Sequence, residues 1–305
     1  PLFPYTTLFG SATPGGSSFL TLQPDAVRDV AGNPNHAGTY SVRNFVADSV
    51  HPQLVSWDLD MNAGVLMFTF SEPVLTSSAS FNACGMQALS SLGSSTLHHD
   101  FTSSGQLVGS YPTGASRIVT WAMPADDLFS VRSVEGLAIS KATSYFTAVP
   151  SCAQDYNGNS LTPILSDNAL QVTNFVSDTT APTLVSYNFV MPSGKLPPAL
   201  VMHFSEPVSL TNFASTDVSL FSTGSAGSGA TLALTGHSDL RRGPANVLTL
   251  TLSDADLQSI RGLSPLGTAK ASTYLMLADN TITDTAGNFM AHMAGPAQVN
   301  VYSVA

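Results

Sequence analysis

The chain is poor in charge, because Asp, Glu, Lys and Arg together make up only 10% of its 305 residues. Twenty acidic and ten basic residues leave a formal net charge of −10, which excludes nucleic acid as an expected partner. Hydrophobic residues make up 43% of the chain, so the low charge does not indicate disorder. The 41 serines and 30 threonines indicate a surface covered by uncharged hydroxyl groups.

Motifs that carry catalysis are also absent. The sequence contains no Gly-x-Ser-x-Gly elbow, His-Glu-x-x-His pair, P-loop or Cys-x-x-Cys. The cluster His98-His99-Asp100 has no counterpart elsewhere and lies in a Ser/Gly-rich stretch, so we expect a solvated loop there. The sequence therefore predicts that the protein is not an enzyme. Its long uncharged stretches are broken by Pro, Gly and Ser, so we expect no membrane span in this segment.

An internal repeat with a period of about 130 residues organises the chain. Phe70-Ser-Glu-Pro-Val74 recurs intact as Phe204-Ser-Glu-Pro-Val208, and Asp155-Tyr-Asn-Gly-Asn159 recurs as Asp284-Thr-Ala-Gly-Asn288. Further matches in the same order predict complete units at 48–177 and 178–305. Residues 1–47 match only the C-terminal part of such a unit, and we expect the natural chain to extend upstream.

Each complete unit is predicted to be almost entirely β. One strand per unit alternates with period two, so we expect one side of it to face a core, namely Leu66, Phe68 and Phe70 in the first unit and Leu200, Met202 and Phe204 in the second. Short helices are expected at 126–134 and 254–263, the second with Ser253 as its N-cap. The fold class predicted is all-β: tandem immunoglobulin-like β-sandwiches, each with one short helical insert.

The segments Asp178–Ser186, Phe204–Val208 and Asp284–Asn288 resemble the bacterial-type Ig-like repeats of long surface proteins. Such repeats occur in S-layer-associated proteins, in large adhesins and in giant extracellular proteins of algae and other protists. The resemblance covers both complete units and the 1–47 segment. It implies an extracellular or cell-surface location and a structural or adhesive role.

The best candidate site follows from the topology of such a sandwich, in which the linker Asp, the Glu-Pro turn and the Asp-x-x-Gly-Asn turn lie at one pole. Carboxylate and amide oxygens are ligands that Ca²⁺ takes, so calcium is a candidate cofactor between consecutive units. The alternative is that these segments are only turns. The two candidate sets are Asp48, Glu72, Asp155 and Asn159, and Asp178, Glu206, Asp284 and Asn288.

Cys84 and Cys152 are the two cysteines of the chain, and both fall in unit 48–177. A disulfide between them is one interpretation, because thiols outside the cell are often bridged; two separately buried thiols are the other. Val218 and Thr281 stand at the matching positions of the next unit. A bridge would therefore reinforce one unit and would not be part of the fold.

Together these patterns predict a structural repeat segment of an extracellular filament, fibre or cell-surface coat. An adhesin stalk, or the non-catalytic spacer of a secreted glycan-active enzyme, is the alternative. The expected partners are copies of the chain itself or neighbouring surface proteins, and glycans on its Ser/Thr-rich loops are compatible with the sequence.

Overall fold

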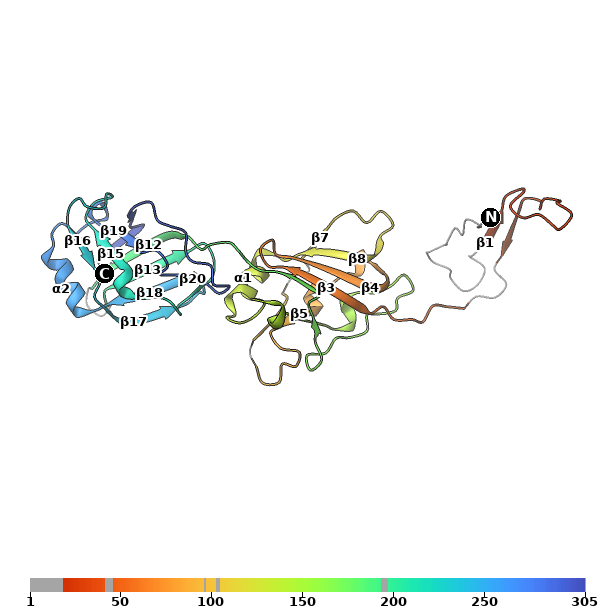
Figure 1. The fold of residues 1–305 in the computed structure, drawn as a ribbon, viewed down its shortest axis with the longest axis horizontal. Coiled ribbons are helices and arrows are strands. Elements are labelled where there is room, and N and C mark those ends of the chain that lie inside the picture. The colour runs from red at the N-terminus through yellow and green to blue at the C-terminus, as the bar shows by residue number, and fades with distance from the viewer. Residues whose placement is uncertain (1–18, 42–45, 96, 103–104, 193–196, 305) are drawn as a thin grey trace.

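The computed structural model describes residues 19–41, 46–95, 97–102, 105–192 and 197–304. Two β-rich units lie end to end along the long axis of the molecule, and an N-terminal hairpin stands apart from them (Figure 1). None of the helices within these ranges has the length and apolar character needed to cross a membrane.

The first unit contains two sheets. Its strands are β3 (Leu54–Asp60), β4 (Val65–Leu75), β5 (Cys84–Gln87), β6 (His98–Asp100), β7 (Gln106–Val108), β8 (Ala115–Ala122), β9 (Tyr145–Ala148), β10 (Leu170–Gln171) and β11 (Asn174–Val176). One sheet has the order β11-β3-β4-β8-β7 and the other the order β10-β9-β5-β6. The chain changes from one sheet to the other between β10 and β11, where Val172 is buried.

The second unit repeats this plan. Its strands are β12 (Leu184–Met191), β13 (Ala199–Phe204), β14 (Val208–Ser209), β15 (Val218–Phe221), β16 (Thr231–Ala233), β17 (His237–Arg242), β18 (Val247–Leu252), β19 (Tyr274–Leu277), β20 (Thr283–Asp284), β21 (Ala297–Gln298) and β22 (Val301–Val304). The two larger sheets have the orders β17-β18-β13-β12-β22 and β16-β15-β19-β21, and β14 pairs with β20. In each unit the first and last strands pair in parallel, β11 with β3 and β22 with β12.

Each unit carries one short α-helix, α1 (Ala125–Ser133) and α2 (Asp254–Gly262), as the sequence predicts. Ser253 caps α2, because its side chain accepts a hydrogen bond from the backbone N–H of Asp256. Pro124 precedes α1 and provides no side-chain cap. Single 3₁₀ turns occur at Thr76–Ser78, Phe81–Ala83, Lys141–Thr143, Pro150–Cys152, Ser215–Asp217 and Lys270–Ser272.

The predicted core face is confirmed in both units. The alternating residues of β4 and β13 (Leu66, Phe68, Phe70, Leu200, Met202 and Phe204) are all at most 5% exposed, whereas Met67 is 39% exposed. Aromatic rings from opposite sheets meet in the first core, where the Trp57 and Phe146 ring centroids lie 5.4 Å apart. The sheets of each unit therefore pack face to face over one apolar core, an arrangement consistent with two β-sandwich domains.

The N-terminal hairpin consists of β1 (Phe19–Leu22) and β2 (Gly38–Ser41), which pair with each other. Phe19, Leu20 and Tyr40 are each more than half exposed, so within the described residues this hairpin has no core of its own. The parts of the predicted partial repeat at 1–18 and 42–45 lie outside the described residues.

Candidate cation site at the joint between the units

Three carboxylates of the second unit meet at the pole that faces the first unit. Asp178 lies in the linker, Glu206 follows β13, and Asp284 ends β20. A ligand oxygen from each lies within 4.8 Å of the other two, and all three residues are buried. We call Asp178, Glu206 and Asp284 the second acidic cluster.

The turn after β20 holds two members of this cluster in place. The Asn288 backbone N–H donates to Asp284 Oδ1 at 2.8 Å. The Asn288 side-chain nitrogen donates to Asp284 Oδ2 at 2.7 Å and to the Asp178 carbonyl oxygen at 3.0 Å. Asp284 therefore forms the turn expected of Asp-x-x-Gly-Asn and also belongs to a carboxylate cluster. The turn interpretation and the cation-site interpretation are thus compatible.

A guanidinium group from the first unit lies among these carboxylates. Arg132, near the C-terminal end of α1, places Nε 3.0 Å from Asp178 Oδ2 and donates from Nη1 to Glu206 Oε2 at 3.2 Å. The Nε–H is not aligned for a hydrogen bond, so its contact with Asp178 is an ion pair without one. Arg132 Nη2 donates to the Met61 carbonyl oxygen at 2.7 Å, which anchors the side chain to its own unit.

Further hydrogen bonds cross the same joint. Asn62 Oδ1 accepts from the backbone N–H of Thr179 at 3.1 Å and from the hydroxyl groups of Thr179 and Thr180. Thr285 Oγ1 donates to the Arg132 carbonyl oxygen at 2.6 Å. Arg242 of the second unit donates to Glu135 at 2.7 Å. The units are therefore held together by a polar contact surface and not by the linker alone.

The charged form of Glu206 is disfavoured in spite of its arginine partner. Burial, and then the neighbouring Asp178, raise the pKa of Glu206 to about 7, while Arg132 acts in the opposite direction. Its second oxygen, Oε1, is buried without a hydrogen-bond partner. One guanidinium thus does not fully compensate three buried carboxylates.

The first unit carries the matching group, the first acidic cluster, made of Asp48, Glu72 and Asp155. Their ligand oxygens also lie within 4.8 Å of one another, but Asp48 is exposed and Glu72 half-buried. The Asn159 side chain donates to Asp155 Oδ2 at 2.8 Å and to the Asp48 carbonyl oxygen at 3.2 Å, as Asn288 does in the second unit.

Burial, followed by the charges of Asp48 and Asp155, raises the pKa of Glu72, and His51 lowers it. Glu72 Oε1 is buried without a hydrogen-bond partner. Over the ranges that the structure describes, neither Arg nor Lys forms an ion pair with this first cluster.

A third copy of the Asp–Asn turn shows which part of the pattern is local. Asp29 accepts from Ala31 N, Asn33 N and the Asn33 side chain, each at 2.9 Å, and these bonds lower the pKa of Asp29. This copy forms on an exposed hairpin, so the turn needs no sandwich around it. The convergence of three carboxylates, in contrast, requires the whole pole of a folded unit.

Either acidic cluster, the partly exposed first one or the buried second one, could hold a metal ion such as Ca²⁺. At the second cluster Arg132 supplies a positive charge that the sequence interpretation did not assign to this site. The one signal in the sequence is that Arg132 and Arg261 stand at matching positions of the repeat. Nothing in the local pattern indicates that Arg132 reaches the next unit.

Cys84 and Cys152 form a disulfide with their Cα atoms 6.3 Å apart. The expectation of a loop at His98–Asp100 is wrong, since these residues form β6, whereas the expected exposure to solvent holds for His98 and Asp100. His99 Nε2 lies 3.0 Å from Asp127 Oδ1, and Thr102 donates to the same oxygen. This group joins the start of α1 to the β6–β7 connection, because buried Asp127 needs partners for its charge.

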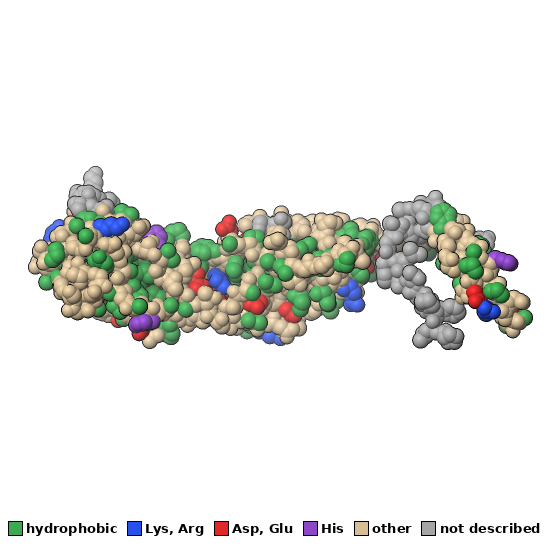
Figure 2. Space-filling model, turned by 90° about the horizontal axis from the view of Figure 1, so that it is seen from above, with side chains coloured by type: hydrophobic (Ala, Val, Ile, Leu, Met, Phe, Trp, Pro, Cys, Tyr) green, Lys and Arg blue, Asp and Glu red, His purple; other side chains and the backbone are tan. Residues whose placement is uncertain are grey.

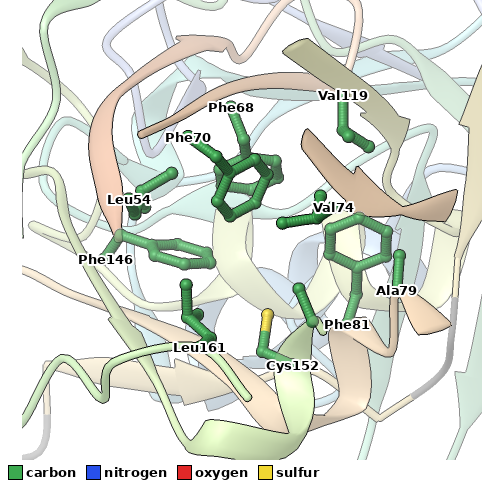
Figure 3. Close-up of a pocket in the computed structure, with 11 residues that line it drawn as sticks. Leu54, Phe68, Phe70, Val74, Ala79, Phe81, Val119, Phe146, Cys152 and Leu161 are labelled. Carbon is green, nitrogen blue, oxygen red and sulfur yellow. The ribbon is translucent and has the colours of Figure 1, made fainter. Parts of the chain in front are cut away.

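The cavities of the described residues offer no second candidate. An apolar void of about 10 Å³ lies in the first core, where Phe68, Phe70, Phe81 and Phe146 point toward one another (Figure 3). A space of that size barely admits one water molecule. An open groove of about 440 Å³ lies beside β5 and β9, and Asp100 is the one titratable residue among those that line it.

Comparisons with known proteins assign no family to the chain. No family model matches it, and no curated protein matches it. A solved structure, a marsupial T cell receptor, aligns over 84% of this chain and 75% of that chain at 11% identity, with a TM-score of 0.17. A similarity this weak identifies neither a shared fold family nor a function.

Proposed function

We propose that this chain is a non-catalytic structural repeat segment of an extracellular filament, fibre or cell-surface coat. The observation that carries the proposal is the joint formed by Arg132 with Asp178 and Glu206, because it fixes one sandwich to the next through buried ion pairs. A flexible tether between independent domains would not need such contacts. An array that carries tension does need them.

Uncharged pairs on the outward sheet face also support this role. Facing pairs on β4 and β8 are Met67 with Thr120 and Thr69 with Ile118, and in the second unit Val201 faces Thr249. These side chains lose little hydration energy when another chain covers them, whereas charged residues are depleted at the centres of interfaces. Charged side chains are sparse on the face drawn in Figure 2.

An extracellular location and an immunoglobulin-like sandwich are part of the same proposal. The Cys84–Cys152 bond favours an oxidising compartment. The two packed sheets and the parallel pairing of first and last strands favour the Ig-like assignment. The proposed partners are copies of the chain or neighbouring surface proteins, with glycans as additional ligands of its hydroxyl-rich surface.

Negative-stain microscopy of the purified chain tests the proposal. Laterally associated fibres are expected, and Ile118→Lys should prevent them by placing a charge on the outward sheet face. Leu165→Lys, at a position 59% exposed away from that face, is the matched control. Isolated rods for both the unmodified chain and the control would instead favour the adhesin stalk or the enzyme spacer, which touch their neighbours end to end.

Ca²⁺ is the second candidate for the cation at either acidic cluster. It is favoured by the unpartnered buried oxygens Glu72 Oε1 and Glu206 Oε1, since hard carboxylate oxygens suit this ion. Thermal unfolding with Ca²⁺ or with EDTA separates the two cations. A melting temperature raised by Ca²⁺ and lowered by EDTA supports a bound metal, because a ligand of the folded state stabilises it by mass action. An unchanged melting temperature supports arginine alone.

A further inference from the structure

The two ends of the two-unit rod carry complementary halves of the internal joint. Arg261 is the second-last residue of α2, as Arg132 is of α1. Arg261 is exposed, and within the described ranges it forms no ion pair or side-chain hydrogen bond. The first acidic cluster lies in the first unit, where Asp48 precedes β3 in the stretch that enters from the N-terminal hairpin.

The first acidic cluster is built on the same frame as the cluster that binds Arg132. In both units an Asn side chain bridges the turn carboxylate and the linker carbonyl oxygen, at 2.8 and 3.2 Å for Asn159 and at 2.7 and 3.0 Å for Asn288. In both units the Glu after the Phe-Ser sequence keeps a buried oxygen without a partner. The first cluster therefore shares this frame with the cluster that receives a guanidinium, with the difference that Asp48 Oδ2 also accepts from the Asn157 side chain at 3.3 Å.

The internal joint provides the independent indication of what the first cluster binds. There the matching carboxylates Asp178 and Glu206 contact a guanidinium at 3.0 and 3.2 Å. Three carboxylates within 4.8 Å repel one another, and a planar, permanently charged guanidinium with several donors relieves that repulsion better than a compact ammonium.

We infer that Asp48, Glu72 and Asp155 bind the Arg261 guanidinium of a second copy of this chain, so that copies associate head to tail. The inference rests on the proposed function as a repeat segment of a filament or fibre, and it adds an end-to-end contact between copies to the lateral association proposed above. The contact repeats the Arg132 joint in trans, with Asp48 in the place of Asp178 and Glu72 in the place of Glu206.

The contact between copies does not reproduce all the hydrogen bonds that flank the internal joint, so we expect it to be weaker than that joint. Pro192 occupies the position of the second unit that matches Asn62, which accepts three hydrogen bonds in the internal joint. Ser49 and Val50 occupy the positions of the first unit that match Thr179 and Thr180, which donate those bonds. The covalent linker also gives the internal joint an effective concentration that separate chains lack, of millimolar order. The association in trans is therefore weak and strongly dependent on salt.

Charge reversal in the full chain tests the inference by sedimentation velocity at low ionic strength and in EDTA. Arg261→Glu alone and Asp48→Arg alone should each lower the association constant by about tenfold or more, because each sets like charges against one another. An equimolar mixture of the two variants should restore association, since each variant then meets an opposite charge. Arg241→Glu and Asp167→Arg, both at exposed positions, are the matched controls and should associate like the unmodified chain.

Several results would overturn the inference. These are an unmodified chain that stays monomeric up to millimolar concentration, charge reversals that leave association unchanged, or a mixture that does not recover. Association that requires Ca²⁺ and survives Arg261→Glu would assign the first cluster to the metal. Asp48 and Arg261 are both exposed, so circular dichroism should show that the variants keep their fold. Lateral fibres seen by microscopy would persist under any of these outcomes, so a failure here is distinct from a failure of the proposed function.

Discussion

At the scale of single residues, the joint depends on a charge balance in a place that excludes water. The Arg132 side chain is 14% exposed and those of Asp178 and Glu206 are at most 7% exposed. Removing such charges from water costs several kcal/mol per ion, and only close opposite charges compensate that cost. Each member of the joint is therefore tolerated because the others are present.

Arg132→Ala should destabilise the second unit by about 3 kcal/mol, because it leaves buried carboxylates without their cation. Urea unfolding followed by circular dichroism measures the loss. Arg241→Ala, which removes an arginine that is 79% exposed, should change stability by less than about 0.5 kcal/mol. Equal effects of the two substitutions would show that the joint is not a stabilising contact.

Glu206 should make stability depend on pH. Its pKa is about 7 in the folded chain against an ordinary 4.5, so between these values the folded state binds more protons than the unfolded state. The contribution of this group to the free energy of unfolding is therefore complete below about pH 4.5 and is lost as pH rises through about 7. At 1.36 kcal/mol per unit this change corresponds to about 3 kcal/mol, and screening by solvent reduces the expected loss to on the order of 2 kcal/mol.

Glu206→Gln removes this titration while keeping the shape of the side chain. Comparing the melting temperature of the variant with that of the unmodified chain from pH 4.5 to pH 8 isolates the effect. The unmodified chain should lose stability relative to the variant as pH rises. Parallel curves would show that Glu206 titrates normally.

At the scale of elements, each helix is attached to its sandwich by a buried carboxylate near its start. Asp256 accepts hydrogen bonds from the Thr235 backbone and hydroxyl, from Gly236 N–H and from the Ser253 hydroxyl, and it is fully buried. Asp127 holds α1 through His99 and Thr102. The pair of helices therefore presents Arg132 and Arg261 from fixed positions.

Asp256→Ala should cost about 3 kcal/mol, since it leaves several buried donors without an acceptor. Asp254→Ala removes an exposed carboxylate from the same first turn and should cost about 0.5 kcal/mol through the helix dipole. Chemical denaturation of both variants provides the measurement. A mild effect of Asp256→Ala would mean that water replaces its contacts.

The elements with strong periodicity were predictable, and those that depend on neighbours were not. Alternation along Leu66–Phe70 predicted the core face of β4, because a strand exposes alternate side chains to opposite sides. Strands β5, β15 and β17 were not predicted. β5 (Cys84–Gln87) is buried on both sides, so alternation along it is absent.

The candidate site was predictable only in part: its carboxylates were, but its contact with the other unit was not. The repeat and the sandwich topology brought Asp178, Glu206 and Asp284 to one pole. The contact with Arg132 depends on how two units stand relative to each other, which no local pattern encodes. Arg132 binds carboxylates of the next unit, whereas the Lys141 ammonium donates to the Thr173 carbonyl oxygen of its own unit at 2.8 Å.

At the scale of the whole molecule, the two units differ in covalent reinforcement. The Cys84–Cys152 bond spans a sequence separation of 68 within the first unit. Closing a loop of that length stabilises a fold by about 4 kcal/mol in the chain-entropy description. The second unit, with Val218 and Thr281 at the matching positions, folds without it.

Replacing both cysteines by serine should lower one unfolding transition and leave the other in place. Differential scanning calorimetry should assign the shifted transition to unit 48–177, with a loss of about 4 kcal/mol. The unmodified chain treated with a reductant should behave in the same way. A shift of both transitions together would mean that the units unfold as one cooperative body.

The parallel pairing of first and last strands also determines how the chain responds to tension. In each unit the linker enters at one end of β3 or β12 and leaves at the opposite end of β11 or β22, and these strands are hydrogen-bonded side by side. A pull along the rod slides one strand past the other, so their evenly spaced hydrogen bonds are loaded simultaneously and do not open one after another. Each sandwich is thus oriented as a shear-loaded mechanical clamp, and such an array would resist stretching until a whole unit yields.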